Sequence, residues 1–510
     1  MPWIDGDNLS PANLNQKSTS VAINVQDPTY GAVGNGTTDD TAAFVAALSA
    51  ATRGDTVFVP SSRTGYLLTS TITVPEDVTL TGNPHGLRTA QWVDGSNLSS
   101  AQSGRGTQLR LSNMTNPAIV LKDNAAVENL VCFYPGQTWD ITSLNSSFVT
   151  YAPTIQLGVS GADLFTPAVR GVHFLGSTVC IDQGDSTGQA VNGVQVEDCS
   201  GVLLGPFLRL RNVSDVAAVS NCHFNPAYAT NFVVDSTVNG DAKVFRTKAA
   251  QLSTVLELGQ VSDLFVSNVY SFGNKHFAHY NRDFYTGDAN EECGGVYTNI
   301  ISDVVYQAFR VDRTNNVTPL AVQGGRIVPA FAPTGAASDA SLMGMLSLRS
   351  SVQTFRGTFT NLRVHSGTLD ASYVTNYTSR ASYSLVADAP LVTATGSNVF
   401  ITNVFFDSAT NGIADSNISN VVRFGPHASA DVERGISVKG LEVESVTTMG
   451  SPLIMNTGLH PTINLTSGTI SIASATGTLP SAVSSRGYMY VGSDSSLYYV
   501  NGSGVSTLIA

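Results

Sequence analysis

Hydrophobic and polar residues alternate in short runs along most of the chain, and turn-forming residues separate the runs. From about 125 to 445 a short alternating strand recurs, in most cases opened by Asn, Gly or Ser. The recurrences are Asn129–Val131, Gly171–Phe174, Gly193–Val196, Ser220–Phe224, Ser267–Tyr270, Ile301–Tyr306, Gly325–Val328, Thr360–Val364, Thr402–Phe406 and Lys439–Val443. Their intervals run from 22 residues (171 to 193) to about twice that length. This period, with no clear helices between the strands, predicts a β-solenoid rather than a β-sandwich or propeller.

One amphipathic helix is predicted near the N-terminus, at about 40–51. Asp39 and Asp40 provide a capping, acidic first turn, and Phe44, Val45 and Leu48 form one apolar stripe. Short strands are predicted around it, at 21–25, 56–59, 66–69 and 78–80.

Composition excludes several further classes of protein. The chain has 46 Gly and 20 Pro in 510 residues and only 13% charged residues, which excludes long helical bundles and coiled coils. The formal net charge is −12, and no block of Lys or Arg occurs. Because nucleic acid requires a concentrated cationic face, we do not expect a nucleic-acid partner.

The cysteines and the apolar runs predict neither a metal site nor a membrane protein. The five cysteines include no CxxC pair, and several lie in apolar stretches such as 131–133, so we expect buried thiols, no disulfide and no cofactor. His276 and His279 with Cys293 lack a fourth ligand for zinc. No run of 18 apolar residues and no secretory signal is visible, so we expect synthesis in the cytoplasm and no membrane insertion.

The most specific pattern lies within 24–82. It consists of Asp27–Tyr30, the loop Gly31–Gly36, Thr38–Ala42, Val57–Pro60, Tyr66–Leu68 and Val78–Gly82. This pattern resembles the opening of pectate-lyase-like right-handed parallel β-helix proteins, and especially the phage tailspike and depolymerase branch. Asn35 departs from the Asp usual there. The resemblance implies that the predicted helix caps the open end of the β-helix and covers the first coil's unpaired strand edge.

Both ends of the chain resemble segments of phage tail proteins. Residues 1–20 resemble virion-attachment segments, which implies tail or adaptor proteins as partners. Residues 463–510 resemble the closing segment of tail fibre proteins, and Asn501-Gly502 is a strong hairpin signal. A lone hairpin is marginally stable, so we expect this segment to pair with other copies in a homotrimer. The predicted divisions are 1–20, 21–124 (β-helix start with the capping helix), 125–462 (β-helix body) and 463–510 (trimerisation segment).

The resemblance implies an all-β tailspike that binds and cleaves a bacterial surface polysaccharide. Such a protein is made in the host cytoplasm, resides in the virion tail and is extracellular after release. A non-enzymatic receptor-binding fibre on the same fold is the main alternative, and a polysaccharide lyase and a cellular pectate-lyase-like enzyme are others. Carboxylate-based hydrolysis is favoured over elimination, because the sequence shows no cluster of Lys or Arg beside its acidic residues.

The densest polar and aromatic stretch begins at Lys275 and extends to Asp312. Asp283 and Asp303 are 20 residues apart, and so are Glu292 and Asp312. If 20 residues make one coil, each pair lies on adjacent coils about 4.8 Å apart, which suits two catalytic carboxyl groups. The candidate catalytic residues are therefore Asp283 and Asp303, with Glu292 in reserve.

The same stretch supplies candidate substrate contacts. The rings of Tyr280 and Tyr285 are expected to stack on sugar faces, Arg282 to bind an acidic glycan, and Asp312 to contact substrate. A second, less aromatic candidate cluster comprises Asp182, Asp185, Glu197 and Asp198. Each of these acids has an alternative role, because Asp and Asn also stabilise turns through their own backbone.

Overall fold

The computed structural model describes most of the predicted β-helix. The described residues are 22–84, 106–112, 115–137, 148–158, 163–184, 189–226, 249–281, 293–312, 317–329, 343–348, 355–364, 382–387, 398–402, 404–406, 410–413, 420–424, 437–439, 488–491, 497–500 and 506–508. The chain divides into two compact units, 1–454 and 455–510. The predicted divisions at 20, 124 and 462 stay predictions.

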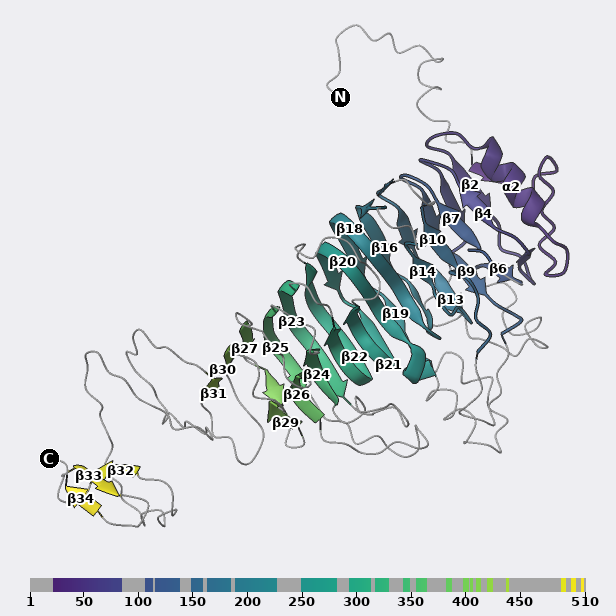
Figure 1. Ribbon diagram of the computed structural model, residues 1–510. Coiled ribbons are helices and arrows are strands. Elements are labelled where there is room, and N and C mark those ends of the chain that lie inside the picture. Colours follow the sequence, from purple (N-terminus) through teal and green to yellow (C-terminus); the bar gives the residue numbers. More distant parts are fainter. Residues whose placement is uncertain are drawn as a thin grey trace, which may run out of the picture. The chain divides into compact units, whose positions relative to one another are not determined.

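The first unit is a right-handed parallel β-helix, which confirms the predicted fold class (Figure 1). Each coil contributes to three faces in the order A, B, C. Face A contains β1 (Ala22–Asn24), β2 (Thr56–Val59), β5 (Thr79–Gly82), β8 (Ala126–Glu128), β12 (Ala168–Arg170), β16 (Val194–Glu197), β27 (Asn398–Thr402) and β30 (Asn420–Phe424). Face B contains β3 (Tyr66–Leu68), β6 (Thr107–Leu111), β9 (Leu130–Phe133), β13 (His173–Leu175), β17 (Ser200–Val202), β19 (His223–Phe224) and β28 (Phe405–Phe406). Face C contains β4 (Ile72–Val74), β7 (Ile119–Leu121), β10 (Ile155–Leu157), β14 (Ile181–Asp182), β24 (Met343–Leu348), β26 (Ser382–Ala387) and β29 (Thr410–Ile413).

Six long strands bend from one face to the next. β18 (Pro206–Ser220) and β20 (Thr254–Ser267) run from face C to face A, and β21 (Tyr270–Tyr280) runs from B to C. β22 (Cys293–Val311) crosses all three faces, while β23 (Val317–Pro329) and β25 (Phe355–Val364) run from A to B.

A few strands lie outside these three faces. β11 (Leu164–Phe165) and β15 (Val191–Asn192) form a separate parallel pair, and β31 (Ser437–Lys439) pairs antiparallel with β30. In the second unit β32 (Tyr488–Val491), β33 (Leu497–Val500) and β34 (Ser506–Leu508) form an antiparallel sheet. All three strands lie within 463–510, and the antiparallel pair β33 and β34 flanks the predicted hairpin turn at Asn501-Gly502. Their assembly role stays a prediction.

The core is built from inward rows of equivalent residues on successive coils. Because side chains alternate across a strand, every second residue points inward and stacks on its counterpart one coil away. On face C one fully buried row runs through Ile72, Ile119, Ile155, Ile181, Leu208 and Leu256. All five cysteines are buried and free, as expected of small apolar side chains. None of the described helices is long and apolar enough to cross a membrane.

The turn from face A to face B repeats one backbone conformation. Asn221, Asn268 and Asn299 have φ of 54°, 54° and 52°, and we call these three residues the asparagine stack. Asn299 Nδ2 donates to Asn268 Oδ1 at 2.8 Å, and Asn268 Nδ2 donates to Asn221 Oδ1 at 3.2 Å. Asn accepts this left-handed backbone better than most residues, which explains why Asn opens so many of the recurring strands.

The predicted helix is present as α2 (Thr41–Ala50), at the N-terminal end of the described coils (Figure 1). Phe44 and Leu48 are buried, and the Phe44 ring lies 5.5 Å from that of Tyr66. Val45 was predicted in the same apolar stripe, but it is 43% exposed because it lies on the outer side of the helix. The capping role of α2 stays a prediction.

Candidate functional site

Face C carries a row of charged residues on its outer surface. Asp182, Arg209, Glu257, His279 and Arg310 occupy equivalent positions on successive coils. Each follows an inward apolar residue, such as Leu208 before Arg209, so alternation directs it outward. Together with Arg211, Asn281 and Asp312 they form what we call the polar ladder.

The N-terminal end of the polar ladder is an acid between two arginines. Asp182 Oδ2 lies 3.8 Å from Arg209 Nη1, and its Oδ1 lies 3.5 Å from Arg211 Nη2. Arg209 Nε donates to Glu257 Oε2 on the next coil at 3.0 Å. Arg209 therefore links two carboxylates on either side of its own coil.

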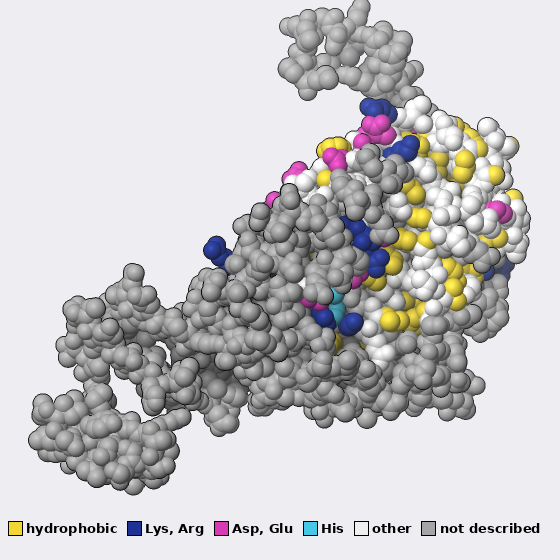
Figure 2. Space-filling view, viewed as in Figure 1, with side chains coloured by type: hydrophobic (Ala, Val, Ile, Leu, Met, Phe, Trp, Pro, Cys, Tyr) yellow, Lys and Arg dark blue, Asp and Glu magenta, His cyan; other side chains and the backbone are white. Residues whose placement is uncertain are grey.

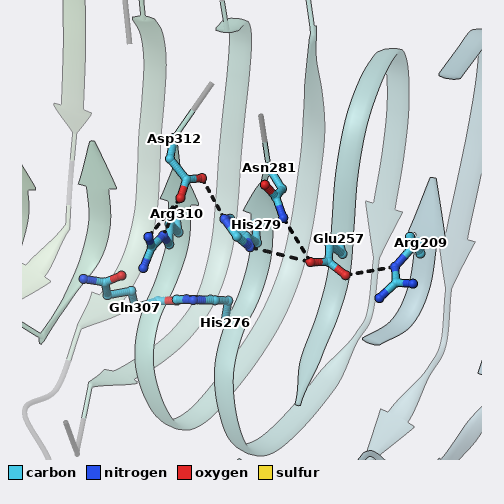
Figure 3. A network of polar contacts seen from close by, with 8 residues as sticks. All are labelled: Arg209, Glu257, His276, His279, Asn281, Gln307, Arg310 and Asp312. Atoms are coloured by element: carbon cyan, nitrogen blue, oxygen red, sulfur yellow. Dashed lines mark hydrogen bonds and ion pairs between the residues drawn. The ribbon is translucent and has the colours of Figure 1, made fainter. Parts of the chain in front are cut away.

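The other end of the polar ladder places an imidazole between two carboxylates (Figure 3). His279 Nε2 lies 2.7 Å from Asp312 Oδ1, and His279 Nδ1 lies 4.0 Å from Glu257 Oε1. Asn281 Nδ2 donates to the same Glu257 oxygen at 3.2 Å. Arg310 contacts Asp312 Oδ2 through both Nε and Nη2 at 2.9 Å.

These side chains are mostly buried, yet they reach the surface. The side chains of Glu257, His279 and Asp312 are 12%, 14% and 18% exposed. In Figure 2 basic, acidic and histidine side chains gather beside one another near the middle of the face shown. A ligand lying on face C can therefore touch charged groups that the protein already holds in place.

The ionisation of Asp312 is set by its neighbours. Burial raises the pKa of this carboxyl, but the hydrogen bond and charge of His279 and the guanidinium of Arg310 outweigh burial and hold the pKa below its ordinary value. Asp312 is therefore ionised at neutral pH.

A second histidine supports the first from inside the coil. His276 is 1% exposed, its Nδ1 donates to the Gln307 carbonyl at 3.2 Å, and its ring centroid lies 5.1 Å from that of His279. Burial, followed by the charges of His279, Lys275 and Arg310, lowers the pKa of His276 well below the usual range. His276 is thus a neutral, fixed neighbour of His279.

The arrangement is suited to acid–base chemistry. Glu257 and Asp312 lie on coils two apart, a spacing of about 9.6 Å between those coils, with His279 on the coil between them. Three arginines balance three carboxylates in the polar ladder. The sequence suggested no arginine cluster beside the acids, and that expectation is wrong, because Arg209 lies beside Glu257 and Arg310 lies beside Asp312 in one row on face C.

The coil length assumed for the predicted catalytic pair is also wrong. β21 pairs with β22 at an offset of 31 residues (Tyr270 with Ile301), not 20. Asp303 therefore stacks on Phe272 and Val328, and it lies on face B, where it binds Arg326.

The other predicted residues have mixed outcomes. Tyr280 is fully buried and its hydroxyl bonds that of Tyr297 at 2.8 Å, so its predicted stacking on sugar is wrong. Its parity in the strand directs it inward with Val311. Asp312 lies in the polar ladder, where its contact with substrate stays a prediction. Arg282, Asp283, Tyr285 and Glu292 lie outside the described residues and stay predictions.

The second candidate cluster does not form one site. Asp182 belongs to the polar ladder on face C, but Glu197 is on face A, with its Oε2 3.4 Å from Arg170 Nε. Asp198 has φ 53° at the turn after face A, where its role is structural. Asp185 lies outside the described residues.

Sequence reasoning missed most of the polar ladder. Arg209, Arg211, Glu257, His279 and Arg310 were not predicted site residues. One signal was present: a single charged residue or histidine between apolar residues recurs in 208–210, 256–258, 278–280 and 309–311. Equivalent positions can be aligned only when the length of each intervening coil is known.

Comparison with known proteins agrees with the fold and its N-terminal pattern. Residues 22–136 match the family model "Rhamnogalacturonase A/epimerase, pectate lyase-like". The resemblance to pectate-lyase-like proteins is confirmed. The matched segment contains the whole pattern within 24–82 and extends through β9. No curated protein matches the sequence.

Several solved structures are similar to this chain. One is the mannuronan C-5 epimerase A-module of Azotobacter vinelandii, at 14% identity and TM-score 0.41, covering 80% of this chain and 100% of that chain. Another is the tailspike protein of Escherichia coli bacteriophage HK620 in complex with a pentasaccharide, at 13% identity and TM-score 0.49, covering 83% of this chain and 68% of that chain. A third is an exopolygalacturonase of Thermotoga maritima, at 9% identity and TM-score 0.44, covering 82% of this chain and 95% of that chain. Identities this low concern the fold and not the activity.

Proposed function

We propose that the protein binds a polysaccharide along face C and cleaves it by acid–base chemistry at the polar ladder. The observation that carries this proposal is the placement of His279 between Glu257 and Asp312, on three successive coils of one outer surface. Extended parallel coils present a long surface to a polymer, and the partly exposed charged groups are fixed by their neighbours before substrate arrives.

Hydrolysis is the reaction that this geometry supports best. Inverting glycosidases separate their two carboxyl groups by about 6.5–9.5 Å, and the coils that carry Glu257 and Asp312 are two steps, or about 9.6 Å, apart. Asp312, ionised through His279 and Arg310, accepts a proton from the attacking water. Glu257, in its protonated form, gives a proton to the leaving glycosidic oxygen and becomes a carboxylate, and His279 holds the two carboxyl groups in position.

Elimination is the second candidate, and the arginines favour it. A lyase neutralises a sugar carboxylate while a base removes the neighbouring proton. Arg209, Arg211 and Arg310 supply cations, and His279 supplies a base. Every one of these arginines already faces a carboxylate of the protein, so we place elimination after hydrolysis.

The biological setting proposed is that of a phage tailspike. In it the polysaccharide belongs to a bacterial surface, residues 463–510 assemble a homotrimer, and residues 1–20 attach to tail or adaptor proteins of the virion. The pectate-lyase-like segment and a tailspike among the similar folds are compatible with this setting. Sedimentation of the full chain and of a chain ending at 462 tests the trimer, and the shorter chain is expected to be monomeric or aggregated.

The activity is tested by incubating the full chain with purified envelope polysaccharide of a candidate host. Hydrolysis produces new reducing ends without ultraviolet absorbance, whereas elimination also produces an absorbing unsaturated sugar. Binding without new ends would replace the enzyme by a receptor-binding fibre. Asp303→Asn is the matched control for Asp312→Asn, because Asp303 also pairs with an arginine but lies on face B.

A further inference from the structure

A second outer surface, on face B, carries a chemically different set of side chains. His223, Tyr270, Ile301, Arg326 and Arg363 occupy equivalent positions on five successive coils. Four coil steps span about 19 Å, a length suited to an oligosaccharide. The row changes from aromatic to cationic along the coils.

The aromatic end presents partly exposed rings. The rings of His223 and Tyr270 meet edge to face with centroids 4.5 Å apart, which fixes both orientations. Phe272 lies two residues beyond Tyr270 on the same side of β21 and is also partly exposed. Flat apolar rings that are held in place and reach the surface suit the apolar faces of sugar rings.

The cationic end places two exposed arginines on adjacent coils with one acid. Arg326 is paired in register with Arg363, and its side chain is 46% exposed. Asp303 holds Arg326 through one carboxylate oxygen, while its other oxygen is buried and has no hydrogen-bond partner among the described residues. Adjacent guanidinium groups favour a carboxylate, sulfate or phosphate.

We propose that face B is a second, non-catalytic binding surface for an anionic glycan, with sugar rings on Tyr270 and Phe272 and the acid group on Arg326 and Arg363. Arg326 and Arg363 are both exposed and lie in register on adjacent coils, so one acid group can contact both guanidinium groups. The surface is short and the chain carries a net charge of −12, so a long polyanion such as nucleic acid is a poor match. This binding does not depend on cleavage at face C.

The test measures binding of the full chain to a panel of oligosaccharides bearing carboxylate, sulfate or phosphate. Each is paired with its neutral counterpart, such as oligogalacturonate with its methyl ester. All proteins carry Asp312→Asn, so that cleavage does not consume the probe. We expect at least one anionic probe to bind, and its affinity to fall about tenfold or more in Arg326→Gln/Arg363→Gln. The neutral counterpart is expected to bind weakly to both proteins.

Two further variants make the outcome specific. Arg356→Gln removes an exposed arginine from the face A part of the same strand, β25, and is expected to leave binding unchanged. Asp303→Asn removes the carboxylate that competes for Arg326 and is expected to keep or raise affinity for the anionic probe. The proposal is overturned if no anionic probe binds, if Arg326→Gln/Arg363→Gln binds as its parent does, or if Arg356→Gln weakens binding equally. Cleavage by the chain with Asp312 intact tests face C separately.

Discussion

The polar ladder and the asparagine stack are both rows of polar residues on successive coils, but they differ in kind. The asparagine stack repeats one residue type, one φ and one side-chain hydrogen bond, and it satisfies itself. The polar ladder mixes Arg, Glu, His and Asp, and its contacts differ at every step. Identical polar residues at equivalent positions indicate that the backbone conformation requires that residue type. A mixed charged row on a regular sheet indicates instead that the side chains have a chemical role.

The largest expected effect is the loss of polysaccharide cleavage when the polar ladder is changed. Asp312→Asn and Glu257→Gln should each reduce polysaccharide cleavage by about a hundredfold or more, the scale of a lost general acid or base. Reducing-end assays measure the rate, and circular dichroism checks the fold. Asp303→Asn should cleave at the parent rate. Equal loss in all three variants would remove the distinction between face C and the rest of the coil.

The next largest effect is a loss of folding stability when the asparagine stack is changed. Asn268→Val should lower the free energy of unfolding by about 2 kcal/mol or more, because a β-branched residue resists positive φ and two side-chain hydrogen bonds are lost. Asn268→Gly accepts the same φ and should lose less. Urea denaturation measures both. Below the melting temperature both variants should retain polysaccharide cleavage. A loss of cleavage without a loss of stability would indicate that the asparagine stack takes part in cleavage directly.

The smallest effect is a pH dependence within the polar ladder. The folded-state pKa of Asp312 lies below its unfolded value of about 3.9, so its ion pairs stabilise the fold above that pH. This stability is lost as pH falls through the lower, folded-state pKa. Asp312→Asn should therefore be less stable than the parent at pH 7, by about 1.5 kcal/mol. The difference should shrink below about pH 4 in thermal unfolding, and a difference independent of pH would contradict the account.

The sequence predicts the parts of this molecule that repeat locally. The helix with Phe44 and Leu48 inward and the Asn-opened strands follow from neighbouring residues, since both express backbone and burial preferences. The polar ladder does not follow, because coil lengths vary: β21 and β22 are offset by 31 residues, whereas β18 and β20 are offset by 48 (Leu208 with Leu256). Assuming 20 residues per coil placed Asp303 beside the wrong neighbours.

The location of a bound glycan tests the central claim most directly. A crystal structure of the full chain carrying Asp312→Asn, soaked with an oligosaccharide of the polysaccharide that the parent cleaves, will show which surface holds the substrate. We predict sugar density on the outer surface of face C, within hydrogen-bonding distance of Glu257 and His279. Density confined to other surfaces, with the polar ladder bare, would contradict the assignment of this row as the site of cleavage.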